Sequence, residues 1–219
     1  MRITRIKQSC FVIKWKDITI VIDPYGIKDQ MDGKIADIIL VSHSHFDHYE
    51  GKSIKRAASS ESTLVFPKSV KKIGKKWKNS MNIVGIEPKK KVEVRGLTIE
   101  GFPMYNIHKL IKFHKKKKRF CGYLVSDGSR TIYHAGDTDR IPEMKYLKQE
   151  NVDIAFLPIG GYFTMNPEQA INAAQDISPK TVVPMHNRLK DLKVFEKTFK
   201  GENEDIELKC LDEGEATQI

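Results

Sequence analysis

The chain has 219 residues, of which 40% are hydrophobic, a composition within the range of packed soluble proteins. Lys and Arg outnumber Asp and Glu by 38 to 28, and the resulting net charge of +10 favours an anionic substrate or a nucleic-acid partner. No apolar run approaches the roughly 18 to 20 residues that span a bilayer, and the three cysteines form no Cys-x-x-Cys pair, which argues against a disulfide framework or a cysteine-built zinc site.

No Pro/Gly/Ser-rich linker divides the sequence, so we expect a single domain over residues 1–219. The first residues, Met1 to Arg5, lead directly into strand-like sequence and lack the apolar core of a signal peptide. We therefore expect a cytoplasmic protein without a membrane partner.

The first half of the chain predicts mainly β-structure. Short β-branched or aromatic runs are separated by polar breaks or by turn signals such as Asp23-Pro24-Tyr25-Gly26. The expected strands are residues 3–6, 11–14, 18–22, 37–41, 64–67, 83–86, 91–94 and 97–102, and residues 49–61 fit a short helix.

The second half alternates strands with helices. The turn Asp127-Gly128 predicts a hairpin of strands 120–126 and 131–135, and residues 152–157 and 181–183 are further expected strands. Asn166, Pro167 and Glu168 provide a cap, a first-position proline and a first-turn acid for one helix, and residues 189–199 carry the apolar stripe of another. Two β-rich halves with helices outside predict an α+β sandwich of layers.

A cluster of potential metal ligands follows the strand expected at residues 37–41. The pattern His43-x-His45-x-Asp47-His48 places four such side chains within six residues. Alternate side chains of an extended chain point the same way, so His43 and His45 can reach one ion together, while Asp47 and His48 can face a second ion at the turn. Zinc and similar metals accept imidazole and carboxylate ligands. A flexible histidine-rich tract is the alternative, but such tracts do not follow a buried strand.

Four further positions could complete this site from loops. Asp137 follows the strand expected at 131–135, and His186 follows the strand expected at 181–183. His108 and His114 both lie in the loop between residues 102 and 120. Loops at strand ends are where a rigid sheet presents catalytic groups.

The order of these motifs along nearly the whole chain closely resembles that of the metallo-β-lactamase superfamily. The resemblance is sharpest toward the branch of L-ascorbate-6-phosphate lactonase-like proteins, on the segments Ser9-Cys10-Phe11, Ile22-Asp23-Pro24, Tyr105-Asn106-Ile107, Tyr133-His134-Ala135-Gly136-Asp137-Thr138-Asp139, Leu157-Pro158-Ile159-Gly160-Gly161 and Pro184-Met185-His186. It implies a four-layer αββα sandwich and a hydrolase with two zinc-type ions.

The resemblance also implies a role for each candidate ligand. A first ion would be held by His43, His45 and a loop histidine; a second by Asp47, His48 and His186; and Asp137 would bridge the two. We choose His114 as the loop histidine, because relatives carry a Tyr-Asn…Phe-His pattern, and His108 is its rival. Redox relatives that carry iron have a glutamate where this chain has His45, so Zn²⁺ is expected, with Mn²⁺ or Fe²⁺ as alternatives.

Two other polar residues are candidates for supporting roles. Asp23 could orient a ligating histidine or serve as a turn residue. His134 alternates with Asp137 along the chain, so we expect a structural or supporting role for it rather than metal ligation. The chain also departs from its relatives where Tyr162-Phe163 follows Gly160-Gly161 in place of a Thr-Tyr order, a change that bears on the substrate pocket.

Two adjacent cations can activate water and neutralise charge that develops on oxygen. We therefore predict hydrolysis of an ester, lactone or phosphoester of an anionic small molecule, with Asp47 as the catalytic candidate that orients water and moves its proton. The alternatives are a nuclease or phosphodiesterase of the same fold, and a nucleic-acid or protein-binding module with structural metals.

A basic tract surrounds His114. It comprises Lys109, Lys112, Lys115, Lys116, Lys117, Lys118 and Arg119. Such a run is most often a solvated loop, but here it could attract a phosphorylated small molecule or an RNA backbone.

Overall fold

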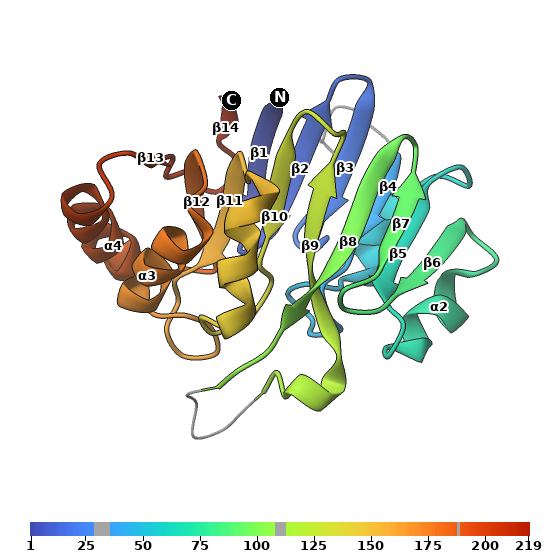
Figure 1. Cartoon of the computed structure of the whole chain (residues 1–219). Helices are drawn as coiled ribbons and strands as arrows, with labels where there is room; N and C mark the ends of the chain where they lie inside the picture. The colour runs from blue at the N-terminus through green and yellow to red at the C-terminus, as the bar shows by residue number, and fades with distance from the viewer. Residues whose placement is uncertain (29–35, 108–112, 188) are drawn as a thin grey trace.

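Two β-sheets face each other, with helices on their outer sides (Figure 1). The structure is a computed structural model and describes residues 1–28, 36–107, 113–187 and 189–219. In these residues the first sheet contains β1 (Arg2–Lys7), β2 (Cys10–Trp15), β3 (Ile18–Ile22), β4 (Ile38–Leu40), β5 (Thr63–Pro67), β6 (Asn82–Ile86) and β14 (Ala216–Gln218). The second contains β7 (Lys91–Val94), β8 (Leu97–Met104), β9 (Phe120–Ser126), β10 (Thr131–His134), β11 (Ile154–Pro158), β12 (Thr181–Met185) and β13 (Glu207–Leu208).

Four α-helices and two 3₁₀ segments complete the described chain. They are α1 (Gly51–Ala57), α2 (Lys71–Trp77), η1 (Lys116–Lys118), η2 (Pro142–Glu150), α3 (Pro167–Ile177) and α4 (Leu189–Glu202). The strand order is β14-β1-β2-β3-β4-β5-β6 in the first sheet and β13-β12-β11-β10-β9-β8-β7 in the second.

The two faces of β4 show how one sheet separates two apolar layers. Ile38 and Leu40 are buried in the core between the sheets, whereas Ile39 packs on the other side with Ile54 of α1 and Trp77 of α2. This division follows from the two-residue period of a strand, in which successive side chains point to opposite faces. The first sheet is therefore covered by α1 and α2 on its outer side.

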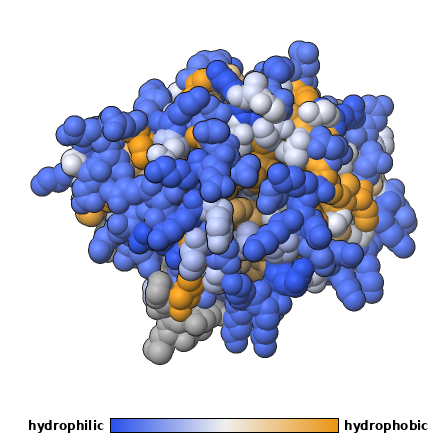
Figure 2. All heavy atoms as spheres, viewed as in Figure 1, coloured by the Kyte–Doolittle hydropathy of each residue, from blue (hydrophilic) through white to orange (hydrophobic). Residues whose placement is uncertain are grey.

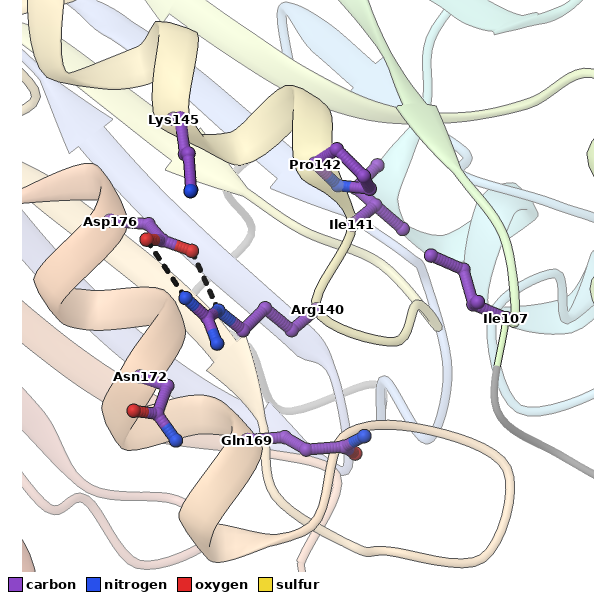
Figure 3. Close-up of a pocket in the computed structure, with 8 residues that line it drawn as sticks. All are labelled: Ile107, Arg140, Ile141, Pro142, Lys145, Gln169, Asn172 and Asp176. Atoms are coloured by element: carbon purple, nitrogen blue, oxygen red, sulfur yellow. Dashed lines mark hydrogen bonds and ion pairs between the residues drawn. The ribbon is translucent and has the colours of Figure 1, made fainter.

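The outer side of the second sheet is covered by η2, α3 and α4. Helix α3 begins with a capping box, in which Asn166 Oδ1 accepts from the amide of Gln169 at 2.8 Å and Gln169 Oε1 accepts from the amide of Asn166 at 3.2 Å. Arg140, two residues before η2, donates to both carboxylate oxygens of Asp176 on α3 at 2.6 and 3.0 Å (Figure 3). The predicted four-layer αββα sandwich is thus confirmed.

Strand direction gathers several loops at one end of the sandwich. Strands β3, β4, β5 and β6 pair in parallel, and so do β10, β11 and β12. Strands β8 and β10 are each antiparallel to β9, so they run in the same direction. Carboxyl ends of strands that share a direction meet at one edge, which is where open α/β sheets bind ligands.

The strands and helices expected from the sequence are present, with ends shifted by a few residues. Helix α2, the 3₁₀ segments and the short strands β13 and β14 were not predicted. Strand β14 pairs with β1, and the terminal amine of Met1 donates to the carbonyl oxygen of Ile219 at 2.9 Å, so the two chain ends lie together (Figure 1). In the described residues, no helix combines the length and apolar character required to cross a membrane.

Candidate metal centre

The loop after β4 is held by the buried carboxylate of Asp23. Asp23 Oδ1 accepts from the amide of Ser42, and Oδ2 accepts from Ser42 Oγ and from His48 Nδ1, each at 2.7 Å. Because Ser42 Oγ gives its proton to Asp23, it accepts the Nδ1–H of His43 at 2.9 Å. These bonds leave Nε2 of His43 and Nε2 of His48 directed away from Asp23, so the sequence-based expectation that Asp23 orients a histidine agrees with its contacts.

Three imidazole nitrogens converge on the first candidate ion position. His43 Nε2 lies 2.9 Å from His45 Nδ1, which lies 3.1 Å from His114 Nε2. Two nitrogens about 2.05 Å from a tetrahedral zinc ion are roughly 3.3 Å apart, close to these separations. Burial lowers the pKa of His43 well below its usual value and that of His114 to about 4, which keeps both rings neutral and their lone pairs available.

A second group lies beside the first. His186 Nε2 is 3.4 Å from Asp47 Oδ2, which is 3.8 Å from His48 Nε2. Burial alone would lower the pKa of His186, but the charges of Asp137 and Asp47 outweigh it and raise that pKa. Burial likewise opposes ionisation of Asp47, yet the hydrogen bond from His186 and the charge of His48 lower the carboxyl pKa. This group therefore contains an ionised carboxylate between two imidazoles.

Asp137 lies between the two groups. Its Oδ1 is 3.2 Å from His48 Nε2, and its Oδ2 is 3.5, 3.7 and 3.9 Å from the Nε2 atoms of His186, His114 and His43. Asp137 Oδ1 and His48 Nε2 are both buried and face each other without the geometry of a hydrogen bond, and neither has another partner in the described part of the chain. Buried polar groups are almost always satisfied, and a cation between these two atoms would satisfy both.

The donor set fits a pair of cations. Ligand atoms of His43, His45, His114 and Asp137 all lie within 4.8 Å of one another, and so do those of Asp47, His48 and His186. These are the seven side chains expected from the sequence. Imidazole and carboxylate suit Zn²⁺ and related ions.

Comparison with known proteins identifies the family of this chain. The family profile described as "Beta-lactamase superfamily domain" matches residues 2–186. The chain belongs to the metallo-β-lactamase superfamily. A UPF0173 metal-dependent hydrolase of Methanopyrus kandleri is 30% identical over 99% of each chain.

Solved structures of other proteins share the fold. A chain named as a metal-dependent hydrolase from Parabacteroides distasonis superposes with a TM-score of 0.80 at 28% identity, over 97% of this chain and 93% of its own. The metallo hydrolase Igni18 from Ignicoccus hospitalis gives a TM-score of 0.81 at 22% identity, over 99% and 97% of the two chains. The family match and the relative from Methanopyrus kandleri make the protein a metal-dependent hydrolase of this superfamily.

The position of His114 depends on an asparagine that the sequence indicated only as part of a family motif. Asn106 Oδ1 accepts from the backbone amide of His114 at 2.9 Å and from its Nδ1 at 3.2 Å, which turns Nε2 of the ring toward His45. Asn106 Nδ2 in turn donates to Phe163 O at 2.9 Å and to Asp139 Oδ1 at 3.3 Å. The rival His108 lies outside the described residues.

The backbone beside His186 is held by Arg5 and Asn187, two residues that the sequence did not indicate. The buried guanidinium of Arg5 donates to Gln8 O at 3.2 Å, to Leu211 O at 2.9 Å and to Asn187 Oδ1 at 2.8 Å. His186 adopts a left-handed conformation, with φ of 49°, directly before Asn187. A Cβ atom at Gly160 would overlap the carbonyl oxygen of His186, so only glycine fits there.

His134 supports the turn that carries Asp137. Its Nε2 donates to Ser9 O at 3.0 Å, and its Nδ1 accepts from the amide of Gly136 at 3.3 Å. Both ring nitrogens are therefore engaged, which agrees with the supporting role expected for it. Gly136 has φ of 62°, and a Cβ there would lie 2.5 Å from Met104 Sδ.

Part of the basic tract is engaged in structural contacts. Lys116 Nζ lies 3.0 Å from Glu143 Oε1 and 3.2 Å from Tyr105 Oη, and Arg119 lies 3.4 Å from Glu87. Lys115, Lys117 and Lys118 are exposed, whereas Lys109 and Lys112 lie outside the described residues. Figure 2 shows that hydrophilic side chains predominate on the face it presents.

A separate hollow of about 420 Å³ lies between η2 and α3 (Figure 3). Its lining includes Arg140, Lys145, Asn172 and Asp176. None of the seven candidate ligands lines it. The bidentate ion pair between Arg140 and Asp176 forms part of this lining. We assign this pair a structural role, because it joins the segment before η2 to α3.

Proposed function

We propose that the protein hydrolyses an ester, lactone or phosphoester of an anionic small molecule at a centre of two ions, Zn²⁺ being the best match. The observation that carries this proposal is the position of Asp137, a buried carboxylate with an unsatisfied oxygen, surrounded by imidazole nitrogens from three loops. His43, His45 and His114 would hold one ion; Asp47, His48 and His186 the other; and Asp137 would contact both.

When bound, two such ions lower the pKa of water and stabilise negative charge that develops on oxygen. The residues of the chain supply the remaining requirements. Three of the histidines have their tautomers fixed by a partner on Nδ1, so that Nε2 faces inward: Asp23 holds His48, Asn106 holds His114 and Ser42 holds His43. Contacts of this kind make the ligands rigid before the substrate arrives.

Asp47 is the proposed proton acceptor. Its carboxylate is partly exposed, and the lowered pKa keeps it ionised at neutral pH. It can therefore orient a water molecule by accepting a hydrogen bond from it, and can carry a proton toward the leaving group. His45 and His186 are also partly exposed, which places the open side of the centre beside Asp47.

The anionic character of the substrate is supported by charge. The exposed Lys115, Lys117 and Lys118 lie close in sequence to His114, and the whole chain carries a net charge of +10. Exposed cations beside a site raise the local concentration of anions. The lactone among the candidate substrates rests on the resemblance to L-ascorbate-6-phosphate lactonase-like proteins, which stays a prediction.

The same lysines favour a second candidate, a phosphodiesterase that acts on RNA or DNA. If three lysines contact phosphates, the logarithm of the binding constant for nucleic acid would fall linearly with the logarithm of salt concentration. We rank this candidate second. Cleavage of a single-stranded RNA together with steep salt dependence would reverse the order.

We further propose that residues 1–219 act as one domain, because both sheets contribute to one continuous apolar core.

The test of function compares the wild-type protein with His45→Ala and Asp47→Ala on a panel of esters, lactones and phosphoesters, after loading with Zn²⁺ and with Mn²⁺. We expect metal-dependent turnover that both variants abolish. Turnover that survives in both variants would contradict the proposal.

A further inference from the structure

Exposed aromatic side chains are concentrated beside the candidate metal centre. In the described residues, the large hydrophobic side chains left exposed are Phe46 (75%), Tyr162 (74%), Tyr146 (67%), Val194 (58%) and Phe113 (45%). Phe46 lies between His45 and Asp47, and Phe113 immediately precedes His114. Phe46, Phe113 and Tyr162, three of these five residues, therefore lie on loops that carry or contact the candidate ligands.

These rings form two groups. In the first, the ring of Phe46 lies 6.0 Å from that of Tyr25, in an edge-to-face arrangement. In the second, the ring of Phe163 lies 4.6 Å from that of Phe113 and 4.7 Å from that of Tyr162. The first group belongs to loops of the first sheet, and the second to loops of the second sheet.

The second group is tied to the centre through its backbone. Phe163 O accepts from Asn106 Nδ2, the amide that also holds His114. The amide of Met165 donates to Thr138 O, directly after Asp137, and Gly161 donates to Met165 O. The turn that carries Tyr162 and Phe163 is therefore hydrogen-bonded both to the loop that carries His114 and to the loop that carries Asp137.

Core packing does not explain rings at this level of exposure, because the apolar cores of both sheets are filled by other residues. Exposed aromatic rings at a rim present apolar surface at low cost in side-chain entropy, which suits recognition of an apolar group. Each CH₂ group of a ligand that becomes buried there would strengthen binding about fourfold.

We infer that Phe46, Phe113 and Tyr162 bind an apolar group of the substrate, an aryl or alkyl chain attached next to the bond that is cleaved. This inference rests on the proposed function, since it takes the metal cluster as the reacting centre. It narrows the substrate class from any anionic small molecule to an amphipathic one.

The test measures binding rather than turnover, with the whole chain loaded with Zn²⁺. Isothermal titration calorimetry would compare phenylphosphonate with methylphosphonate, which share an anionic head and differ in apolar area. We expect the wild-type protein to prefer phenylphosphonate at least tenfold, on the order of the gain from burying a ring. The preference should fall to near one in the combined Phe46→Ala, Phe113→Ala and Tyr162→Ala variant.

Two further variants serve as controls. Tyr146→Ala removes an equally exposed ring on η2 and should leave the preference unchanged. Phe46→Leu keeps apolar surface and should retain most of the preference, even if the combined variant folds poorly.

Equal binding of the two phosphonates by the wild-type protein, or no binding of either, would overturn the inference. So would a preference that persists in a folded combined variant. Aromatic-dependent binding to phospholipid vesicles without a phosphonate preference would instead assign the rings to a membrane surface and reject a substrate role. Failure of the metal centre itself would be seen separately, as loss of zinc in metal analysis.

Discussion

The two ends of the β9–β10 hairpin each carry a buried or half-buried aspartate, and the contacts of the two carboxylates are opposite in kind. At the closed end, Asp127 Oδ1 accepts from the amide and hydroxyl of Ser129 and the amide of Arg130, and Oδ2 accepts from Trp15 Nε1 and Lys16 Nζ. At the open end, Asp137 is buried among imidazoles, with Oδ1 unsatisfied in the described structure.

The difference shows how to tell a structural carboxylate from one that awaits a ligand. Asp127 is saturated by donors from its own turn and from the neighbouring β2–β3 turn, so its role is complete in the folded chain. The neighbours of Asp137 are side chains of the types that bind metals, and a cation between them and its carboxylate would complete the contacts of Asp137. Substitutions at the two ends should therefore affect different properties.

Asp137→Asn should produce the largest functional effect. The amide removes the negative charge between the two groups, and losing several kcal/mol of transition-state stabilisation would slow turnover on the order of 10³-fold or more. The melting temperature without added metal should change little. The measurement is turnover and zinc content against Asp127→Asn, and normal zinc content and activity in Asp137→Asn would refute the role given to this carboxylate.

Gly160→Ala should follow in size. The new Cβ would overlap the carbonyl oxygen of His186, so the backbone of His186 must move. A displacement of about 1 Å of a catalytic group costs on the order of 10²-fold in rate. Gly201→Ala is the matched control, because a methyl group at that position on α4 would have no atom within 4 Å. Equal activity of the two variants would contradict the role given to Gly160 in positioning His186.

Asp23→Asn should weaken metal binding without removing a ligand. Its carboxylate accepts the Nδ1–H of His48, and losing such support typically costs about 10- to 100-fold in metal affinity. Asp153, directly before β11, accepts from the amide of Thr131 and from Lys180, and Asp153→Asn is the control. Competition with a zinc chelator would measure the metal affinity of both variants, and we expect a loss in Asp23→Asn alone.

Asp127→Asn should have the smallest effect, and on stability only. The hydrogen bonds from Lys16 and from the Arg130 amide hold the pKa of this carboxyl below its usual value. A folded-state pKa lower than the unfolded one stabilises the protein above the unfolded pKa, and this contribution is lost as pH falls through the folded value. Lys16 is exposed, so we expect a loss of about 1 kcal/mol at pH 7.

The pH dependence of the loss in unfolding free energy shows how much of it comes from the charge of Asp127, since asparagine keeps the shape of the side chain and removes the charge. The difference in unfolding free energy between wild type and Asp127→Asn should be complete at pH 7 and shrink below about pH 4. Urea denaturation at several pH values would measure it. A difference independent of pH would mean that the charge of Asp127 contributes nothing.

The sequence predicted the features whose cause is local. The His43-x-His45-x-Asp47-His48 pattern follows a buried strand, so its geometry could be derived from strand periodicity and a turn. The hairpin at Asp127-Gly128 and the cap of α3 at Asn166 are likewise encoded within a few residues.

Features that depend on distant contacts could not be derived in this way. Arg5 reaches Asn187 across 182 positions, and nothing near Arg5 in the sequence indicates that contact. Helix α2 has only seven residues and no side-chain cap, and its signal is masked by lysines. The 3₁₀ segment η2 lacks the 3.6-residue period that reveals an α-helix.

If the cluster holds two ions with Asp137 between them, a crystal structure of the Zn²⁺-loaded protein, with anomalous scattering measured at the zinc edge, should show both. We expect two peaks: one about 2.0 to 2.2 Å from nitrogens of His43, His45 and His114, and one at similar distances from Asp47, His48 and His186. Asp137 would contact both ions. Zinc bound elsewhere, or a fully loaded crystal without a peak in this cluster, would contradict the account.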